Sequence, residues 1–96
     1  MNLPDRIFAV GGAGKAITYE LLRATWVQEA VLRPRPNPRT LTVTIIDTAE
    51  EEENRDLERI SEIEAEIQET KTRLREEHSG RPGEIDITYL PLTKNI

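Results

Sequence analysis

The fold of this chain is decided by the stretch Arg6-Ile7-Phe8-Ala9-Val10-Gly11-Gly12-Ala13-Gly14-Lys15. Its first half is a short apolar run, which is typical of a buried parallel strand, and its second half is a cluster of glycines. Helix-forming residues follow over 15–32, with apolar side chains at steps of three and four. The stretch therefore predicts a strand over 6–10 that turns through glycines into one helix, which ends near Leu32 because prolines follow.

The rest of the chain supplies two more strands and one more helix. Residues 41–47 are rich in β-branched side chains and predict a second strand, parallel to the first, while residues 85–90 alternate as a third strand does. Between them, residues 50–78 predict a long acidic amphipathic helix. We therefore expect an α/β fold in a single domain over 1–96: a Rossmann-like β-α-β-α-β three-layer unit with a short parallel sheet and one long charged helix.

The position of the third strand at the end of the sequence adds an expectation about the whole protein. A three-stranded parallel sheet leaves apolar surface to cover, because such sheets are normally buried on both faces. We therefore expect the chain to be a fragment, a truncated paralogue or an obligate partner subunit.

The composition excludes several classes of protein. A formal net charge of −5 over 96 residues disfavours nucleic-acid binding by general phosphate neutralisation. The chain has no cysteine and one histidine, and its acidic run over 50–53 lacks the spacing of a calcium loop, so no metal site is predicted. Because the apolar runs are only strand-sized and the start lacks a signal-peptide pattern, we expect a cytoplasmic protein with no membrane partner.

A strand that turns through glycines into a helix can bind phosphate. The first amides of a helix have no internal acceptor, and glycines let a ligand approach them closely. We therefore predict a nucleotide at this turn, with the Lys15 ammonium adding charge toward the phosphates. The alternative is that the glycines only let helix and strand pack closely. The predicted phosphate-binding residues of the turn are Gly11, Gly12, Ala13 and Gly14.

Two familiar nucleotide motifs match this turn incompletely. A Walker P-loop requires a serine or threonine after its lysine, and Ala16 stands there. A dinucleotide fingerprint over 12–17 requires a last glycine where Ile17 stands. Asp47, at the end of the second strand, keeps a Rossmann site for NAD or an adenylate open, because an acid there can bind ribose hydroxyls. Alternatively, Asp47 caps the turn that continues through Thr48.

The stretch Phe8-Ala9-Val10-Gly11-Gly12-Ala13-Gly14, together with the strand end Asp47-Thr48-Ala49, resembles the opening of the tubulin and FtsZ-like GTPase superfamily. The order of elements is similar to the start of prokaryotic tubulin-like proteins. The resemblance implies GTP or GDP as the ligand, held by residues 11–15 with Asp47 and Thr48, and assembly with further copies or with a partner subunit.

The match to this superfamily has two gaps. Lys15-Ala16 replaces the small or polar pair that the family places after the glycines, and the signature Gly-Gly-Gly-Thr-Gly-Ser/Thr-Gly is absent, as is the acidic loop that completes hydrolysis. The 96 residues are therefore expected not to hydrolyse GTP alone, and the resemblance leaves the need for Mg²⁺ open.

The long charged helix carries a narrow apolar stripe at steps of three and four, made of Ile60, Ile63, Ile67 and Leu74. The pattern is that of a short coiled coil, in which Glu66 and Lys71 are spaced to pair across the interface. It predicts an oligomer, or a non-catalytic interaction protein that dimerises through this helix. The alternative is that the stripe packs on the sheet as the crossover helix.

Overall fold

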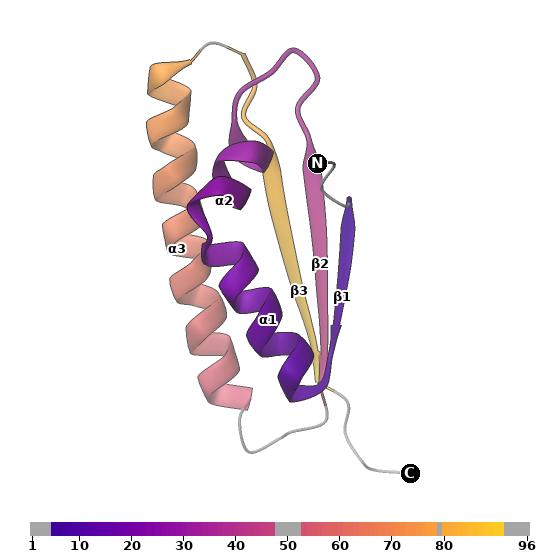
Figure 1. Cartoon of the computed structure of the whole chain (residues 1–96). Helices are drawn as coiled ribbons and strands as arrows, with labels where there is room; N and C mark the ends of the chain where they lie inside the picture. Colours follow the sequence, from indigo (N-terminus) through magenta and orange to yellow (C-terminus); the bar gives the residue numbers. More distant parts are fainter. Residues whose placement is uncertain (1–4, 48–52, 79, 92–96) are drawn as a thin grey trace.

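The computed structural model of the protein describes residues 5–47, 53–78 and 80–91. Within these residues, three parallel strands lie in the order β1-β2-β3 and three helices pack against them (Figure 1). The predicted α/β class with a parallel sheet is therefore confirmed. In chain order the elements are β1 (Arg6–Val10), α1 (Gly11–Arg23), α2 (Thr25–Leu32), β2 (Thr40–Asp47), α3 (Glu53–Glu77) and β3 (Glu84–Pro91).

The strand boundaries agree with the sequence prediction to within one residue at each end. Long runs of β-branched and apolar residues specify them, because each strand needs one face that the core can accept. The helix predicted over 50–78 is observed over Glu53–Glu77, and residues 50–52 lie outside the described part of the chain.

The prediction of one helix before β2 is wrong, because the chain breaks at Ala24 into α1 and α2. Leu22 and Val27, on either side of the break, are both completely buried. In an unbroken helix, residues five positions apart would point in different directions. The extended backbone of Ala24 reorients α2 so that both side chains enter the same core, and the Gln28 side-chain amide donates a 2.7 Å hydrogen bond to the Leu22 carbonyl that the break leaves free.

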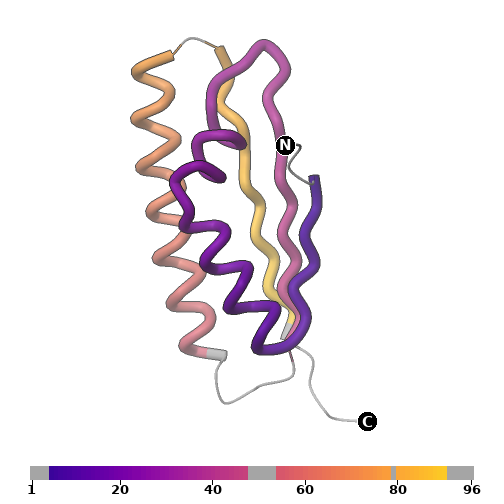
Figure 2. The backbone as a smooth tube through the Cα atoms, viewed as in Figure 1, coloured from indigo at the N-terminus to yellow at the C-terminus, as the bar shows by residue number. Residues whose placement is uncertain are grey.

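The predicted three layers are also wrong, because all the described helices lie on one face of the sheet (Figures 1 and 2). The chain moves in one direction across the sheet, from β1 to β2 to β3. Two crossovers of the same hand then place their helices on the same side. In its described part the protein has two layers, and the other face of the sheet carries no helix.

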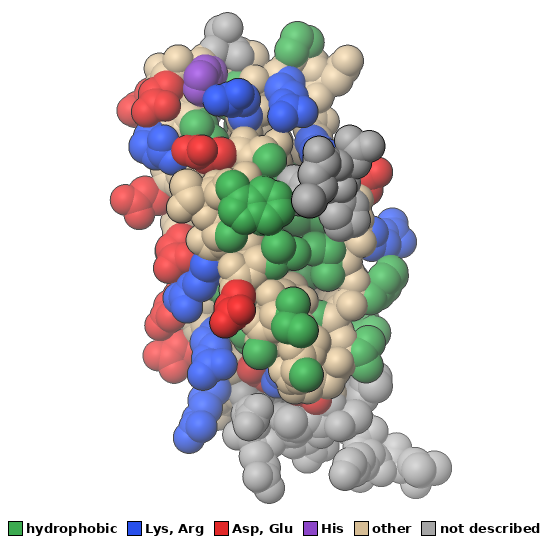
Figure 3. Space-filling view, in the orientation of Figure 1, with side chains coloured by type: hydrophobic (Ala, Val, Ile, Leu, Met, Phe, Trp, Pro, Cys, Tyr) green, Lys and Arg blue, Asp and Glu red, His purple; other side chains and the backbone are tan. Residues whose placement is uncertain are grey.

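The core lies between this sheet and the helices. Alternate side chains of each strand point into it, and those of β2 are the most deeply buried. The surface over α3 is instead charged, and Figure 3 shows many acidic and basic side chains there. The buried apolar residues are Ala9, Tyr19, Leu22, Val27, Val31, Leu32, Leu41, Val43, Ile45, Ile60, Ile63, Ile67 and Leu74.

Gly83 closes the amino end of the sheet. Its amide donates to the Leu32 carbonyl at 3.2 Å, and the next amide, of Glu84, donates to the Arg39 carbonyl at 2.8 Å. A Cβ atom at Gly83 would lie 1.8 Å from the Val31 carbonyl oxygen. Only glycine lets β3 begin this close to the end of α2.

Candidate functional site

The glycine turn lies at the carboxyl end of the sheet. β1 ends at Val10 and α1 begins at the next residue, so strand and helix are joined without a loop. β2 runs parallel to β1 and ends at Asp47 on the same side, where Figure 1 shows α1 beginning. In open α/β sheets, ligands bind at this end of the strands.

The amino end of α1 is built without the usual caps. Val10 occupies the N-cap position and makes no side-chain hydrogen bond there, and the first turn of α1, which lies wholly among the described residues, contains no acidic residue. Gly12 and Ala13 are exposed. The positive end of the helix dipole therefore meets no protein carboxylate in its first turn, which favours an anionic ligand.

The glycines of the turn have different roles. Gly11 has a φ of 76°, a conformation that favours glycine. A Cβ at Gly14 would make an ordinary contact with the Ala9 backbone, at 3.6 Å. At Gly12 a Cβ would meet no described atom within 4 Å, and the φ is not positive. Neither backbone conformation nor described packing requires glycine at Gly12, so a side chain at this position would meet no described atom near its Cβ.

Lys15 points into the protein. Its side chain is 4% exposed, and its ammonium group forms ion pairs with the carboxylates of Asp47 and Asp56, the latter at 2.7 Å. The lysine that the sequence places among the phosphate-binding residues therefore joins three elements, α1, β2 and α3, behind the turn.

Asp56 is the central acceptor of this cluster and was not among the site residues predicted from the sequence. Besides the ammonium of Lys15, it accepts hydrogen bonds of 3.3 Å each from the hydroxyls of Tyr19 and Tyr89. Asp56 lies four residues before Ile60, so it extends the apolar stripe of α3 by one step. An acid at a stripe position is the signal that could have revealed a buried carboxylate.

The cluster perturbs its titratable groups. Burial alone would lower the pKa of Lys15, but hydrogen bonds to Asp47 and Asp56 and the charges of both carboxylates raise it above its ordinary value. Burial and the neighbouring charge of Asp56 raise the pKa of Tyr19 to about 12, and the same two causes raise the pKa of Tyr89. At neutral pH the lysine is thus charged and both phenols are protonated, so Lys15, Tyr19 and Tyr89 can all donate hydrogen bonds to Asp56.

Asp47 lies where the sequence places it, at the carboxyl end of β2, but its side chain is only 7% exposed. Its carboxylate is engaged by Lys15, so it is not presented to a ribose in this structure. The predicted neighbour, Thr48, lies outside the described residues.

The stripe of α3 faces the protein's own core. Ile60, Ile63, Ile67 and Leu74 are at most 7% exposed, as expected of a crossover helix, so this surface is not open to a second chain here. The charged residues beside the stripe also pair within the chain, since Glu66 pairs with Arg23 on α1 and Lys71 pairs with Glu84 on β3.

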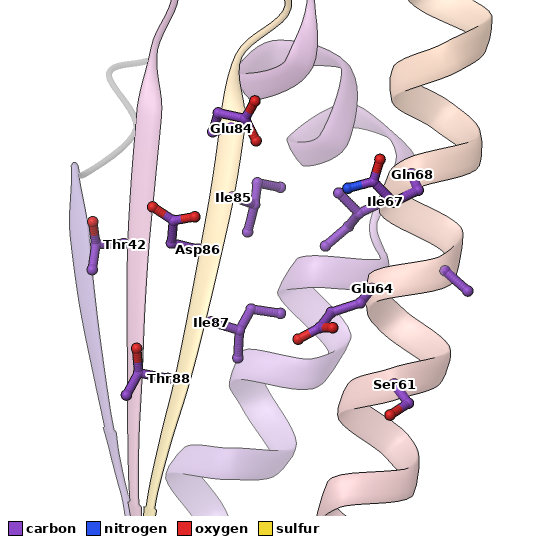
Figure 4. Close-up of a pocket in the computed structure, with 11 residues that line it drawn as sticks. Thr42, Ser61, Glu64, Ile67, Gln68, Glu84, Ile85, Asp86, Ile87 and Thr88 are labelled. Carbon is purple, nitrogen blue, oxygen red and sulfur yellow. The ribbon is translucent and has the colours of Figure 1, made fainter.

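Two pockets in the described part of the chain lie away from the glycine turn. A pocket of about 780 Å³ follows the edge of β3 beside α3, between Ile85 and Ile87 on the strand and Ser61, Glu64 and Gln68 on the helix (Figure 4). A second, of about 300 Å³, is lined by residues of α1 and α3. Among the described residues, neither pocket is lined by the glycine turn. The candidate phosphate site is a turn at the end of the sheet in which Gly12 and Ala13 are exposed.

Two further features bear on the partners of the chain. In residues 5–47, 53–78 and 80–91, no group of three or more histidine, cysteine or acidic side chains is placed to hold a metal ion. No helix in this part of the chain combines the length and the apolar character that crossing a bilayer requires.

Comparison with protein-family models, with curated proteins and with solved structures finds no match to the chain.

Proposed function

We propose that this chain is a nucleotide-binding module of the tubulin and FtsZ-like type, which holds GTP or GDP at the turn over residues 11–14. The observation that carries the proposal is the amino end of α1, which follows β1 directly, contains three glycines and has neither a side-chain cap nor an acid in its first turn. Amide donors at such an end match phosphate oxygens.

The architecture supports the same proposal. A strand, a crossover helix and a parallel strand, repeated once, form a Rossmann-like half-domain that binds phosphates at the first strand-to-helix turn. Here that turn is 11–14, and β1 is an edge strand of the sheet. The remainder of a nucleotide site, including the loops for hydrolysis, would come from another copy or a partner subunit, so the chain alone binds without hydrolysing.

Lys15 has a different role in this proposal from the one that the sequence suggests. Because its ammonium is buried between Asp47 and Asp56, it holds the start of α1 against β2 and α3 and so fixes the turn. It acts as a positioning residue, and the backbone amides provide the phosphate contacts. The engagement of Asp47 by Lys15 also disfavours an NAD or adenylate site, which would use that carboxylate for the ribose.

The experiment is isothermal titration of the chain with GTP, GDP, ATP and NAD, each with and without Mg²⁺. The test variant is Gly12→Val, which adds a branched side chain in the first turn of α1 at a position where a Cβ meets no described atom within 4 Å. The control is Ala16→Val, which adds similar bulk at an exposed position one turn further along α1. Circular dichroism establishes that both variants fold.

The expected result is binding of GTP and GDP that Gly12→Val abolishes and Ala16→Val preserves. Preference for ATP or NAD would contradict the guanine assignment and favour the dinucleotide alternative. Failure of the folded chain to bind any of the four would overturn the proposal and leave an interaction protein with purely structural glycines.

A further inference from the structure

The face of the sheet opposite the helices is a regular surface that no described element covers. Phe8 and Val10 on β1 are 60% and 67% exposed, and Leu90 on β3 is 46% exposed. Phe8, Val10 and Leu90 are large apolar side chains on one face, which is uncommon for a solvated surface. Parallel sheets are normally covered on both sides, so this face is built to be buried.

The strand register arranges this face in rows. Arg6, Thr42 and Asp86 form one row across the sheet, with the basic residue at one edge and the acid at the other. Figure 4 shows the alternation along β3, where Asp86 and Thr88 point away from the side on which Ile85 and Ile87 face α3. The remaining rows, toward the carboxyl end, are Phe8, Thr44 and Thr88, and then Val10, Ile46 and Leu90.

We propose that two copies of this chain pack open face against open face, around a two-fold axis parallel to the strands. This rotation places β1 of one copy over β3 of the other and β2 over β2. It does not shift positions along the strands, so each row lies opposite the same row of the second copy. Arg6 then faces Asp86 of the second copy, Val10 faces Leu90, and Ile46 faces Ile46. The face is complementary to itself under this rotation, as an isologous interface requires.

The spacing of packed sheets fits the charged row. Sheets stack about 10 Å apart, a gap that the long side chain of Arg6 and the short one of Asp86 can span together. The pair lies at the edge of the sandwich, where it is partly solvated, and it occurs twice in the dimer. It therefore fixes the orientation while the apolar rows supply the burial.

The other face-to-face rotation, about an axis perpendicular to the strands, fits poorly. It would reverse the rows and set Arg6 against Val10 and Asp86 against Leu90, which buries charges on apolar side chains. The occupant that matches the rows is thus a second copy of the chain in one orientation.

The face is small. Three strands at about 4.8 Å spacing and at most eight residues long cover roughly 15 by 25 Å, so the dimer would bury about 750 Å² in total, which is the size of a weak, transient interface. We therefore expect a weak dimer with a Kd of roughly 10 to 100 µM. This inference does not depend on nucleotide binding, because the face and the glycine turn are different surfaces.

The first test is sedimentation of the 96-residue chain over roughly 1 to 300 µM, which spans the expected Kd. The test variant is Leu90→Lys and the matched control is Leu57→Lys, because Leu57, on α3, is nearly as exposed (45%) as Leu90 (46%). The expected result is a monomer–dimer equilibrium that Leu90→Lys shifts to monomer and Leu57→Lys leaves unchanged. A monomer at every concentration, or a dimer that tolerates Leu90→Lys, would overturn the proposal.

The second test is a charge exchange. Arg6→Asp and Asp86→Arg each place like charges opposite each other and should weaken the dimer at least about tenfold. The double variant Arg6→Asp/Asp86→Arg restores opposite charges and should recover the dimer, since of the two face-to-face rotations only the proposed one brings these two residues together across the interface. Failure of the double variant to recover association, in a folded chain, would rule out this axis.

Discussion

The ammonium nitrogen of Lys15 lies 2.7 Å from the carboxylate of Asp56, which follows it by 41 residues, and both side chains are almost completely buried. With Asp47 as the second acid, the contact joins α1, α3 and β2 at the carboxyl end of the sheet. Burial removes water from all three charged groups, so the attraction between the cation and the two acids must offset this loss of hydration. Removal of the cation would leave two buried negative charges without their counter-charge.

Replacement of Lys15 by methionine should destabilise the protein by about 3 to 5 kcal/mol, because it leaves two carboxylates buried without their cation. The comparison variant is Arg23→Met, whose exposed pairs with Glu62 and Glu66 should contribute less than about 1 kcal/mol. Urea unfolding of both variants measures the difference. Equal losses in the two variants would contradict the assigned role of Lys15.

The stability of the protein should fall as the pH rises above about 10. Tyr19 has a pKa of about 12 in the folded chain against 10.0 for the free phenol, so between these values the unfolded state releases a proton that the folded state keeps. The loss attributable to Tyr19 is at most about 2 to 3 kcal/mol and is absent below pH 10. The raised pKa of Lys15 acts in the same direction.

Tyrosinate absorbance gives a direct measurement of this effect. The chain has two tyrosines, and both have raised pKa values, so little tyrosinate should form near pH 10 until the protein unfolds in urea. Tyr19→Phe should remove part of the alkaline loss of stability. Titration of both phenols near pH 10 in the folded protein would show that the Asp56 cluster is not formed in solution.

Two neighbouring glycines should respond differently to alanine. Gly11→Ala should cost about 1 to 2 kcal/mol, because its φ of 76° is unfavourable for a residue with a Cβ. Gly12→Ala should be neutral or stabilising by up to about 1 kcal/mol, since its backbone is not strained and a Cβ meets no described atom. Thermal unfolding of the pair measures this difference, and a comparable loss in both would mean that Gly12 is required by the fold.

Gly83→Ala should be among the most damaging single substitutions, with a loss of about 3 kcal/mol or more. The added Cβ would lie 1.8 Å from the Val31 carbonyl oxygen and 2.8 Å from that of Arg39, and neither is the flexible end of a side chain. Relief requires moving the start of β3 and losing its hydrogen bonds to Leu32 and Arg39. Soluble yield and urea midpoint measure the effect, and a midpoint like that of the parent would exclude this packing.

The sequence predicted local features well. Strand positions follow from runs of β-branched and apolar residues, and parallel pairing follows from the helices between them. The helix break at Ala24 was not predictable, because residues 15–32 all suit a helix, and only packing against α3 and the sheet decides which way Val27 must point. The three predicted layers failed for a similar reason, since strand order determines which face each helix covers.

For the candidate site, too, one part was predicted from the sequence and another part was found only in the structure. The glycine turn was identified from the sequence, because its residue types alone determine how closely a ligand can approach the amides. The partners of Lys15 were not identified, because a lysine next to glycines suggests phosphate contact, whereas its observed acids lie 32 and 41 residues away.

The sequence by itself determined the α/β class, the three strands and the turn over residues 11–14, because these depend on short-range patterns of apolar residues, glycines and prolines. Only the tertiary structure decided that Lys15 turns inward to Asp47 and Asp56, that the α3 stripe packs on its own sheet, and that one sheet face is covered by no described element. Each of these depends on which distant segments become neighbours, and the direction in which the chain crosses the sheet determines that.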